Sequence, residues 1–155
     1  MNKYSPATIL IVEDEPSNID VAINFLKDSY KIRVATNVKQ AFNILEKQYH
    51  EIDLILSDIK MPDTDGYDFC RLLKQNNETK DIPVIFLTGL TEVIDITKGF
   101  SAGAVDYITK PLQGDVLQAR VKTHVTLRHN QKLLAKQVDQ LKEVAKLKED
   151  VEKIT

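Results

Sequence analysis

The sequence lacks the features that mark secreted and membrane proteins. Its single cysteine, Cys70, excludes an internal disulfide and suits a reducing compartment. No apolar run approaches the roughly 20 residues that cross a bilayer, and the N-terminus lacks the apolar core of a signal peptide. We therefore expect a soluble, cytoplasmic protein that has no membrane partner.

An excess of one charge is also missing, because the net charge of the 155 residues is only −2. So small a charge gives no indication of binding to nucleic acid. The charges are unevenly distributed, however: residues 113–155 hold nine basic and six acidic side chains, whereas residues 1–112 hold twelve and seventeen. The acidic body suits the binding of a cation, and the mildly basic tail does not amount to a DNA-binding arm.

Two kinds of hydrophobic segment alternate along residues 7–112. Short runs rich in β-branched residues predict strands at 7–12, 30–35, 52–57, 82–87 and 104–108. Apolar residues at helical spacing predict helices at 16–27, 38–48, 65–75 and 92–102. Strands that each precede a helix predict an α/β fold with a doubly wound, five-stranded parallel sheet. In the strand order 2-1-3-4-5, the first and third strands lie side by side where the winding changes direction.

Residues 113–155 contain no proline, and their only glycine is Gly114, so they predict one long helix. Apolar residues repeat about every 3.5 positions along it, at Leu127, Leu134, Val138, Leu141 and Ala145. Gln131 occupies one position of this stripe and Lys148 interrupts it. The stripe resumes after a phase slip of the stammer type, at Val144, Leu147, Val151 and Ile154. We expect a homodimer in which a second copy covers this extended coiled-coil helix; the alternative is a frayed, solvated helix.

Polar residues suited to phosphate and cation chemistry stand at four strand ends, namely Glu13 with Asp14, Asp58, Thr88 and Lys110. In open α/β sheets, ligands bind outside the carboxyl ends of the strands. Asp58 is the candidate nucleophile toward a phosphoryl donor. The three acids would repel one another, and a divalent cation such as Mg²⁺ or Mn²⁺ would relieve that repulsion. Lys110 and Thr88 are suited to bind phosphoryl oxygens.

Four segments around these residues resemble the conserved blocks of receiver domains from two-component response regulators. They are Val12-Glu13-Asp14-Glu15, Leu56-Ser57-Asp58-Ile59-Lys60-Met61-Pro62-Asp63-Thr64-Asp65-Gly66, Leu87-Thr88-Gly89 and Asp106-Tyr107-Ile108-Thr109-Lys110-Pro111. The resemblance implies a flavodoxin-like receiver domain at residues 1–125. A helical coiled-coil linker at 126–155 would follow it and lead to an output domain, so we expect the chain to be part of a longer protein.

The resemblance also implies what the residues do. Asp58 would accept a phosphoryl group from a phosphohistidine on a histidine kinase or a histidine phosphotransfer protein. The cation would be held by Glu13, Asp14, Asp58 and the backbone carbonyl of Lys60. The domain would catalyse only its own phosphorylation and dephosphorylation, and it would have no direct nucleic-acid partner.

Switching would involve Thr88 and the aromatic side chain of Tyr107, which similar domains move on phosphorylation. The signal would then pass through the face formed by residues 92–125 into the C-terminal helix. The resemblance further implies a cis peptide bond between Lys110 and Pro111.

Each of these residues also has a purely structural interpretation. Glu13 and Asp14 could cap a helix, Asp58 could occupy a turn, Thr88 could end a strand without a role, and Lys110 could be a surface charge. We interpret Asp63 and Asp65 as turn and helix-cap residues, and Cys70 as a buried thiol. The three histidines, His50, His124 and His129, lack the spacing of metal ligands and are expected at the surface or in the tail.

Other functions remain as alternatives. An aspartate-based phosphatase or phosphotransferase often carries a second aspartate two residues after its nucleophile, where this chain has Lys60. A flavin-binding module with the same strand order would place an FMN phosphate against an acidic rim. The chain could also be a dimerisation module with a vestigial site, or the regulatory receiver segment of a larger histidine kinase or another output enzyme.

Overall fold

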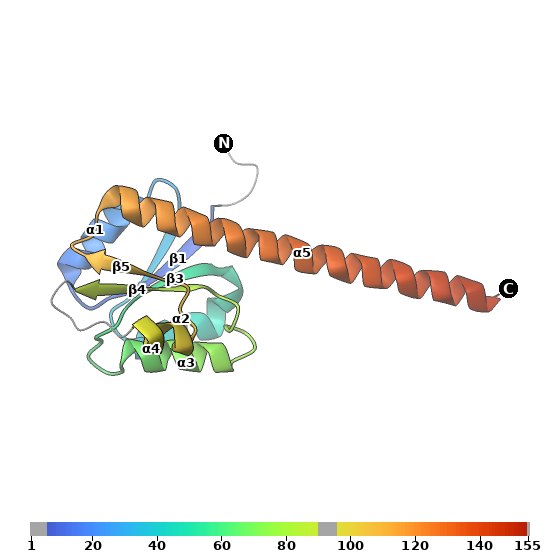
Figure 1. Ribbon diagram of the computed structural model, residues 1–155, viewed down its shortest axis with the longest axis horizontal. Helices are drawn as coiled ribbons and strands as arrows, with labels where there is room; N and C mark the ends of the chain where they lie inside the picture. Colours follow the sequence, from blue (N-terminus) through green and yellow to red (C-terminus); the bar gives the residue numbers. More distant parts are fainter. Residues whose placement is uncertain (1–5, 90–95, 155) are drawn as a thin grey trace.

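The computed structural model describes residues 6–89 and 96–154 and has the predicted α/β architecture. A five-stranded, all-parallel sheet in the order β2-β1-β3-β4-β5 lies between two layers of helices (Figure 1). The strands are β1 (Thr8–Val12), β2 (Lys31–Ala35), β3 (Ile52–Asp58), β4 (Val84–Gly89) and β5 (Asp106–Lys110). The helices are α1 (Pro16–Leu26), α2 (Val38–Gln48), η1 (Tyr49–Glu51, a 3₁₀ turn), α3 (Gly66–Gln75), α4 (Ile96–Ala102) and α5 (Gly114–Ile154).

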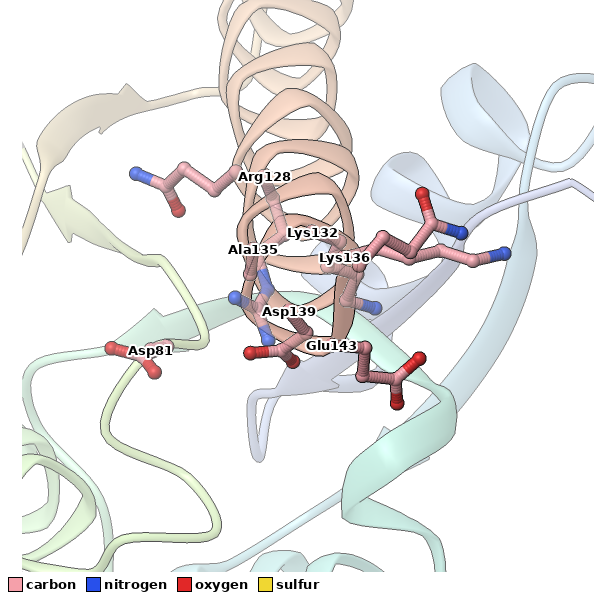
Figure 2. A pocket seen from close by; sticks show the side chains of 9 residues that line it. Asp81, Arg128, Lys132, Ala135, Lys136, Asp139 and Glu143 are labelled. Atoms are coloured by element: carbon pink, nitrogen blue, oxygen red, sulfur yellow. The ribbon is translucent and has the colours of Figure 1, made fainter. Parts of the chain in front are cut away.

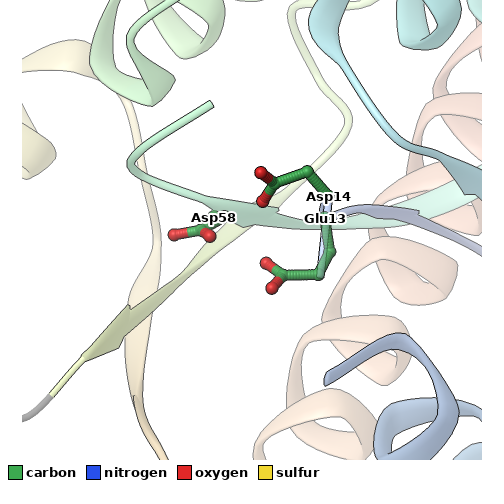
Figure 3. A group of neighbouring side chains, drawn as sticks. All are labelled: Glu13, Asp14 and Asp58. Carbon is green, nitrogen blue, oxygen red and sulfur yellow. The ribbon is translucent and has the colours of Figure 1, made fainter. Parts of the chain in front are cut away.

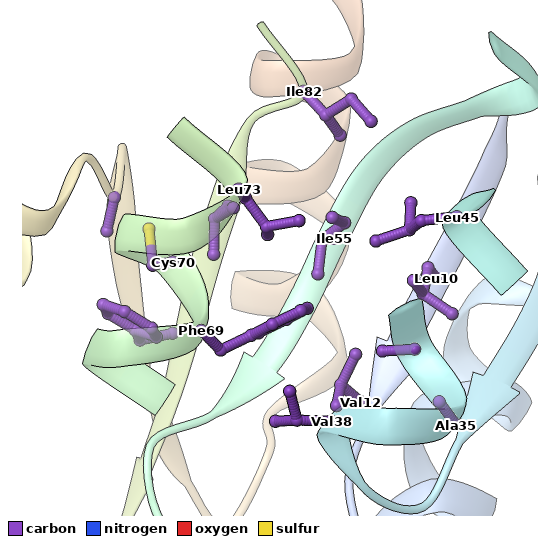
Figure 4. Close-up of a cluster of buried hydrophobic side chains, with 14 of the residues drawn as sticks. Leu10, Val12, Ala35, Val38, Leu45, Ile55, Phe69, Cys70, Leu73 and Ile82 are labelled. Atoms are coloured by element: carbon purple, nitrogen blue, oxygen red, sulfur yellow. The ribbon is translucent and has the colours of Figure 1, made fainter. Parts of the chain in front are cut away.

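The sheet is covered on both faces, which explains why its central strands are almost continuously apolar. Helices α1 and α5 cover one face, where Leu26, Leu117 and Val121 pack against β1, β3 and β4. Helices α2, α3 and α4 cover the other face, and Figure 4 shows Phe69 of α3 in that cluster. Cys70 lies in the same cluster, as predicted, and burial raises the pKa of its thiol to about 11.

Strands β4 and β5 each begin and end two residues later than predicted. The prediction followed the apolar runs at 82–87 and 104–108, but strand pairing is made by the backbone and continues through polar residues. Thr88 pairs with Thr109 and Gly89 with Lys110. Thr88 and Lys110 therefore lie within the sheet instead of after its strands. Of the helix predicted at 92–102, α4 begins at Ile96, and positions 92–95 lie outside the described residues.

Asp63 and Asp65 both cap helices, although not in the same way. Asp65 is the N-cap of α3, and its Oδ1 accepts a hydrogen bond from the Tyr67 amide. Asp63 caps a different helix, because its two oxygens accept from the amides of Val38 and Lys39 at the start of α2, each at 3.0 Å. These hydrogen bonds, that from Val38 foremost, lower the pKa of Asp63. The loop after Asp58 is thereby attached to α2.

Helix α5 is attached to the body beyond residue 125. Its Lys132 Nζ lies 2.9 Å from Asp53 Oδ1, while Asp53 Oδ2 accepts a hydrogen bond from the Thr8 amide at 2.9 Å. Beyond this ion pair the helix extends away from the sheet (Figure 1). Within the described residues, none of the helices combines the length and the apolar character that a membrane span requires.

His50 lies at the surface, and His124 and His129 lie in the C-terminal helix, as predicted. His50 and His129 are exposed, but the side chain of His124 is only 15% exposed. Its Nε2 lies 3.1 Å from Asp106 Oδ2, and Arg120 Nη1 lies 2.7 Å from Asp106 Oδ1. The sequence did not predict this pairing, in which Asp106 on β5 draws both basic side chains of α5 toward the sheet. Hydrogen bonds from Tyr107 N–H and His124, together with the charge of Arg120, lower the pKa of Asp106 although its burial opposes this.

Candidate functional site

The three predicted acids meet at the carboxyl edge of the sheet. Figure 3 shows Glu13 and Asp14, directly after β1, turned toward Asp58, the last residue of β3. One carboxylate oxygen from each lies within 4.8 Å of the others. Glu13 and Asp58 are buried, whereas Asp14 is exposed. The cluster is therefore open to solvent on the side of Asp14.

Strand register and one glycine bring these carboxylates together. Val12 pairs with Ser57, so the next residues along both strands, Glu13 and Asp58, lie at the same level. The loop after Asp58 turns back sharply, and the Gly66 amide donates to the Ile59 carbonyl at 2.6 Å. A Cβ at Gly66 would lie 2.5 Å from the Asp58 carbonyl oxygen, so this close approach requires glycine.

Lys110 holds the two buried acids together from β5. Its Nζ lies 3.0 Å from Asp58 Oδ2 and 3.2 and 3.3 Å from the two oxygens of Glu13. Burial alone would lower the pKa of Lys110, but the hydrogen bond and charge of Asp58, with those of Glu13, outweigh it and raise that pKa. The ammonium group is therefore a fixed positive charge beside Asp58.

One ammonium group does not fully compensate three carboxylates. The pKa of Glu13 is raised to about 7, because burial, the largest cause, and the neighbouring Asp58 raise it by more than Asn18 and Lys110 lower it. Asn18 was not among the predicted site residues. Its Nδ2 donates to Glu13 Oε1 at 2.8 Å and to Glu15 Oε2 at 3.0 Å. The available signal was its position in the first turn of α1, four residues after Asp14.

The remaining predicted residues surround this cluster. Thr88 is fully buried on β4, one residue beyond Leu87, which pairs with Asp58. Its Oγ1 has no hydrogen-bond partner among residues 6–89 and 96–154. The Lys60 amide donates to Asp58 Oδ1 at 3.3 Å.

Tyr107 lies on β5 next to Asp106, and its ring packs against Phe86 and Phe100, with centroid distances of 5.7 and 5.5 Å. The peptide bond between Lys110 and Pro111 is cis, as the resemblance implied.

The donor set fits a small, hard divalent cation. Three carboxylates offer only oxygen, which Mg²⁺ and Mn²⁺ prefer, and their uncompensated charge disfavours the cluster without a cation. The Thr88 hydroxyl, which has no partner within the described parts of the chain, fits a ligand with acceptor oxygens. The described residues thus suit a cation together with a phosphoryl group.

Comparison with known proteins decides the family. A sequence model described as "Response regulator receiver domain" matches residues 9–122, which is most of the chain. The chain belongs to the receiver domain family of response regulators. It therefore has a role in two-component phosphorelay signalling, and this favours signalling over an aspartate-based phosphatase.

Three relatives illustrate the similarity of this receiver to others. A protein named probable cyclic di-GMP phosphodiesterase from Vibrio cholerae serotype O1 is 42% identical over 91% of this chain and 32% of its own length. Response regulator Rre1 from Synechocystis sp. is 35% identical over 76% of this chain and 51% of its own. The solved receiver domain of a signal transduction histidine kinase from Syntrophus aciditrophicus is 37% identical, with a TM-score of 0.70 over 77% of this chain and 90% of that one. The chain spans about a third to a half of the length of these two curated relatives.

The raised pKa of Glu13 predicts a pH-dependent affinity for Mg²⁺. Below about pH 7 this carboxyl keeps its proton, which a cation must displace in order to bind. We expect the affinity measured by titration calorimetry to fall by up to roughly tenfold per pH unit below pH 7 and to level off above it. Glu13→Gln should bind Mg²⁺ more weakly and without this dependence. A wild-type affinity that does not change with pH would contradict the assignment.

The buried Thr88 hydroxyl, without a hydrogen-bond partner in the ranges that the structure describes, predicts a substitution that stabilises the fold. Thr88→Val keeps the shape and removes a buried polar atom, so we expect the free energy of unfolding without Mg²⁺ to rise by about 1 kcal/mol. Thr79 is the matched control, because its buried Oγ1 donates to the Leu73 carbonyl at 2.7 Å. Thr79→Val should lower the free energy of unfolding by about 1–2 kcal/mol. Urea unfolding of both variants tests this, and equal losses would refute it.

Proposed function

We propose that Asp58 accepts a phosphoryl group from a phosphohistidine on a histidine kinase or a histidine phosphotransfer protein. The observation that carries this proposal is the contact of one Asp58 oxygen with Lys110 Nζ at 3.0 Å, in a cluster that also contains Glu13 and Asp14. A buried carboxylate at the carboxyl edge of a parallel sheet, open on the side of Asp14, is accessible to an incoming phosphoryl group.

In the proposed reaction, an Asp58 oxygen attacks the phosphorus atom. The phosphorus–nitrogen bond breaks, its electron pair remains on the histidine nitrogen, and a phosphorus–oxygen bond forms at Asp58. Lys110, already beside Asp58, balances the charge of the phosphoryl oxygens. The Thr88 hydroxyl donates to one of these oxygens and gains the partner that it lacks among the described residues.

The Mg²⁺ or Mn²⁺ ion would be held by Glu13, Asp14, Asp58 and the Lys60 carbonyl. Its contribution is positive charge that allows a phosphoryl group to approach three acids. Asn18 fixes the Glu13 carboxylate by its 2.8 Å hydrogen bond, and the Lys60 amide orients Asp58. We propose that these two hydrogen bonds keep the carboxylates in position before the ion binds.

We propose Thr88 and Tyr107 as the switch residues. A phosphoryl group that engages Thr88 pulls on β4, and the ring of Phe86 on this strand packs against Tyr107. The carbonyl of Tyr107 accepts a hydrogen bond from Arg120 on α5 at 2.7 Å. A continuous set of contacts therefore supports transmission from Asp58 to α5 through the face at residues 92–125, of which positions 96–125 are described.

The receiver at residues 1–125, with residues 126–155 as linker, would control an output domain of a longer protein. The V. cholerae relative named probable cyclic di-GMP phosphodiesterase matches both the receiver and most of α5, which supports an output enzyme of that class. In this proposal, the chain acts only on its own phosphoryl group and forms a homodimer through α5. The expectation that it does not bind nucleic acid directly stays a prediction.

The acceptor assignment predicts the outcome of labelling with a small phosphodonor. Incubated with Mg²⁺ and acetyl phosphate, the wild-type chain should gain the mass of one phosphoryl group in intact mass spectrometry. Asp58→Asn should gain none, and Lys110→Ala should react about 10²–10³-fold more slowly, because it loses the fixed charge.

Asp20→Asn, an exposed aspartate on α1, serves as the control and should behave as wild type. An Asp58→Asn chain that still gains the mass would show that another residue is the acceptor.

The position of Tyr107 predicts an unusual effect of a glycine substitution. A Cβ on Gly99 of α4 would lie 1.6 Å from Tyr107 Oη, so Gly99→Ala must displace the tyrosine and should destabilise the fold by about 1–3 kcal/mol. In a Tyr107→Ala background the clash is absent. There Gly99→Ala should stabilise by up to about 1 kcal/mol, because alanine is the better helix former. Urea unfolding of this double-mutant cycle measures the coupling, and additive effects would exclude it.

A further inference from the structure

The outer side of α5 carries an apolar stripe that the body does not cover. Leu117 and Val121, near the start of the helix, are fully buried against the sheet. From Leu127 onward the apolar side chains are exposed, by 41% at Val138 and by as much as 83% at Ile154. A helix that leaves its domain with such a stripe needs another apolar surface against it.

The body cannot supply that surface, because the side of α5 that faces the body is polar where the helix leaves it. Figure 2 shows this region, a groove of about 830 Å³ lined mostly by charged side chains, among them Arg128, Lys136 and Asp139. Lys132 on the same side forms the ion pair with Asp53. Gln131 also lines this groove, and Leu127 and Gln131 line a smaller hollow together with Val105, so the stripe begins next to the body. From Leu134 onward the stripe is exposed to solvent.

The spacing of the residues within the stripe is typical of a two-stranded coiled coil. Leu127, Leu134 and Leu141 are seven residues apart and occupy equivalent positions, conventionally called d. Gln131 and Val138 fall at the intervening a positions. Leucine at d with a β-branched residue at a favours parallel dimers, and a single polar residue at a fixes the register.

From this pattern we infer that two copies of α5 pair as a parallel, in-register, two-stranded coiled coil that begins at Leu127. The inference rests on the proposed homodimer and adds its orientation, its register and its starting point. A second copy is the matching occupant because it presents the same stripe at the same spacing. In register, the two Gln131 amides face each other and can pair across the interface.

Antiparallel pairing fits the residues less well. In an antiparallel coil, a positions lie opposite d positions. The registers that keep Val138 in the core then place Gln131 opposite Leu134, Leu141 or Lys148. Either leucine leaves a buried amide without a partner, and Lys148 brings an ammonium group into the core. Both outcomes are costly.

The start of the coil is fixed by contacts with β5. The two preceding core positions hold Arg120 and His124, and both side chains are bound to Asp106 at 2.7 and 3.1 Å. They are therefore engaged by their own sheet and cannot enter a coil core, so the first free layer is Leu127. Arg120 also donates to the Tyr107 carbonyl. The last turn before the coil thus contacts the strand that carries the proposed switch residue.

Cysteine cross-linking of the full chain tests the orientation. Leu127→Cys, Leu134→Cys and Leu141→Cys, each made singly, should all form a disulfide-linked dimer under mild oxidation, because equivalent d residues meet in a parallel coil. An antiparallel pair brings equivalent residues together only near its midpoint, so at most one variant could react. The wild-type chain is the control for Cys70, which is buried. Lys136→Cys controls for random collision, because Lys136 lies off the stripe in the polar groove.

Light scattering on the unoxidised wild-type chain separates the two claims. A monomer mass would overturn the proposed homodimer itself. A dimer mass with cross-linking at one position or at none would overturn the parallel, in-register arrangement and leave the homodimer standing. Leu134→Asp should convert the dimer to monomer while circular dichroism shows a folded body, and a dimer that persists in this variant would exclude the stripe as the interface.

Discussion

The ammonium group of Lys110 between Glu13 and Asp58 is the interaction on which the site depends. Two buried carboxylates at adjacent strand ends would repel each other without it, and even with it the pKa of Glu13 is raised. The strand order makes the contact possible, because it brings the ends of β1, β3 and β5 to one edge. The resulting excess of negative charge makes the site receptive to a cation, and the fixed positive charge makes it receptive to a phosphoryl group.

Much of the fold could be predicted because its strands are separated by amphipathic helices at regular intervals. The buried face of each helix follows from the period of its hydrophobic residues. The strand order follows from the right-handed crossovers between parallel strands. The ends of β4 and β5 could not be predicted, because Thr88 and Lys110 have polar side chains. Their backbones nevertheless continue the strand pairing. Asp63 shows a further limit, since its partner helix lies 25 residues earlier in the sequence. Local rules predict a cap but not which distant helix receives it.

The site was more predictable than its surroundings. Glu13, Asp14, Asp58 and Lys110 lie together because each stands at the carboxyl end of a strand, and the motif spacing marks those ends. Asn18 and the pairing of His124 with Asp106 depend on side-chain directions across the packed elements, which spacing does not encode. The residues that the sequence did not predict are therefore those that position the site or connect it to other elements. The charged residues of the site itself could be predicted from the sequence.

Helix α5 continues without interruption for 41 residues, from the edge of the sheet to Ile154. At 1.5 Å per residue it is roughly 60 Å long, about twice the length of the portion that is anchored as far as Lys132. A tilt of only about 5° where it meets β5 would move its far end by roughly 5 Å. A displacement at the acidic edge that is too small to alter the core would therefore be amplified at the far end of the helix. A stiff helix of this length converts a small chemical change at the site into a larger movement of whatever domain it carries.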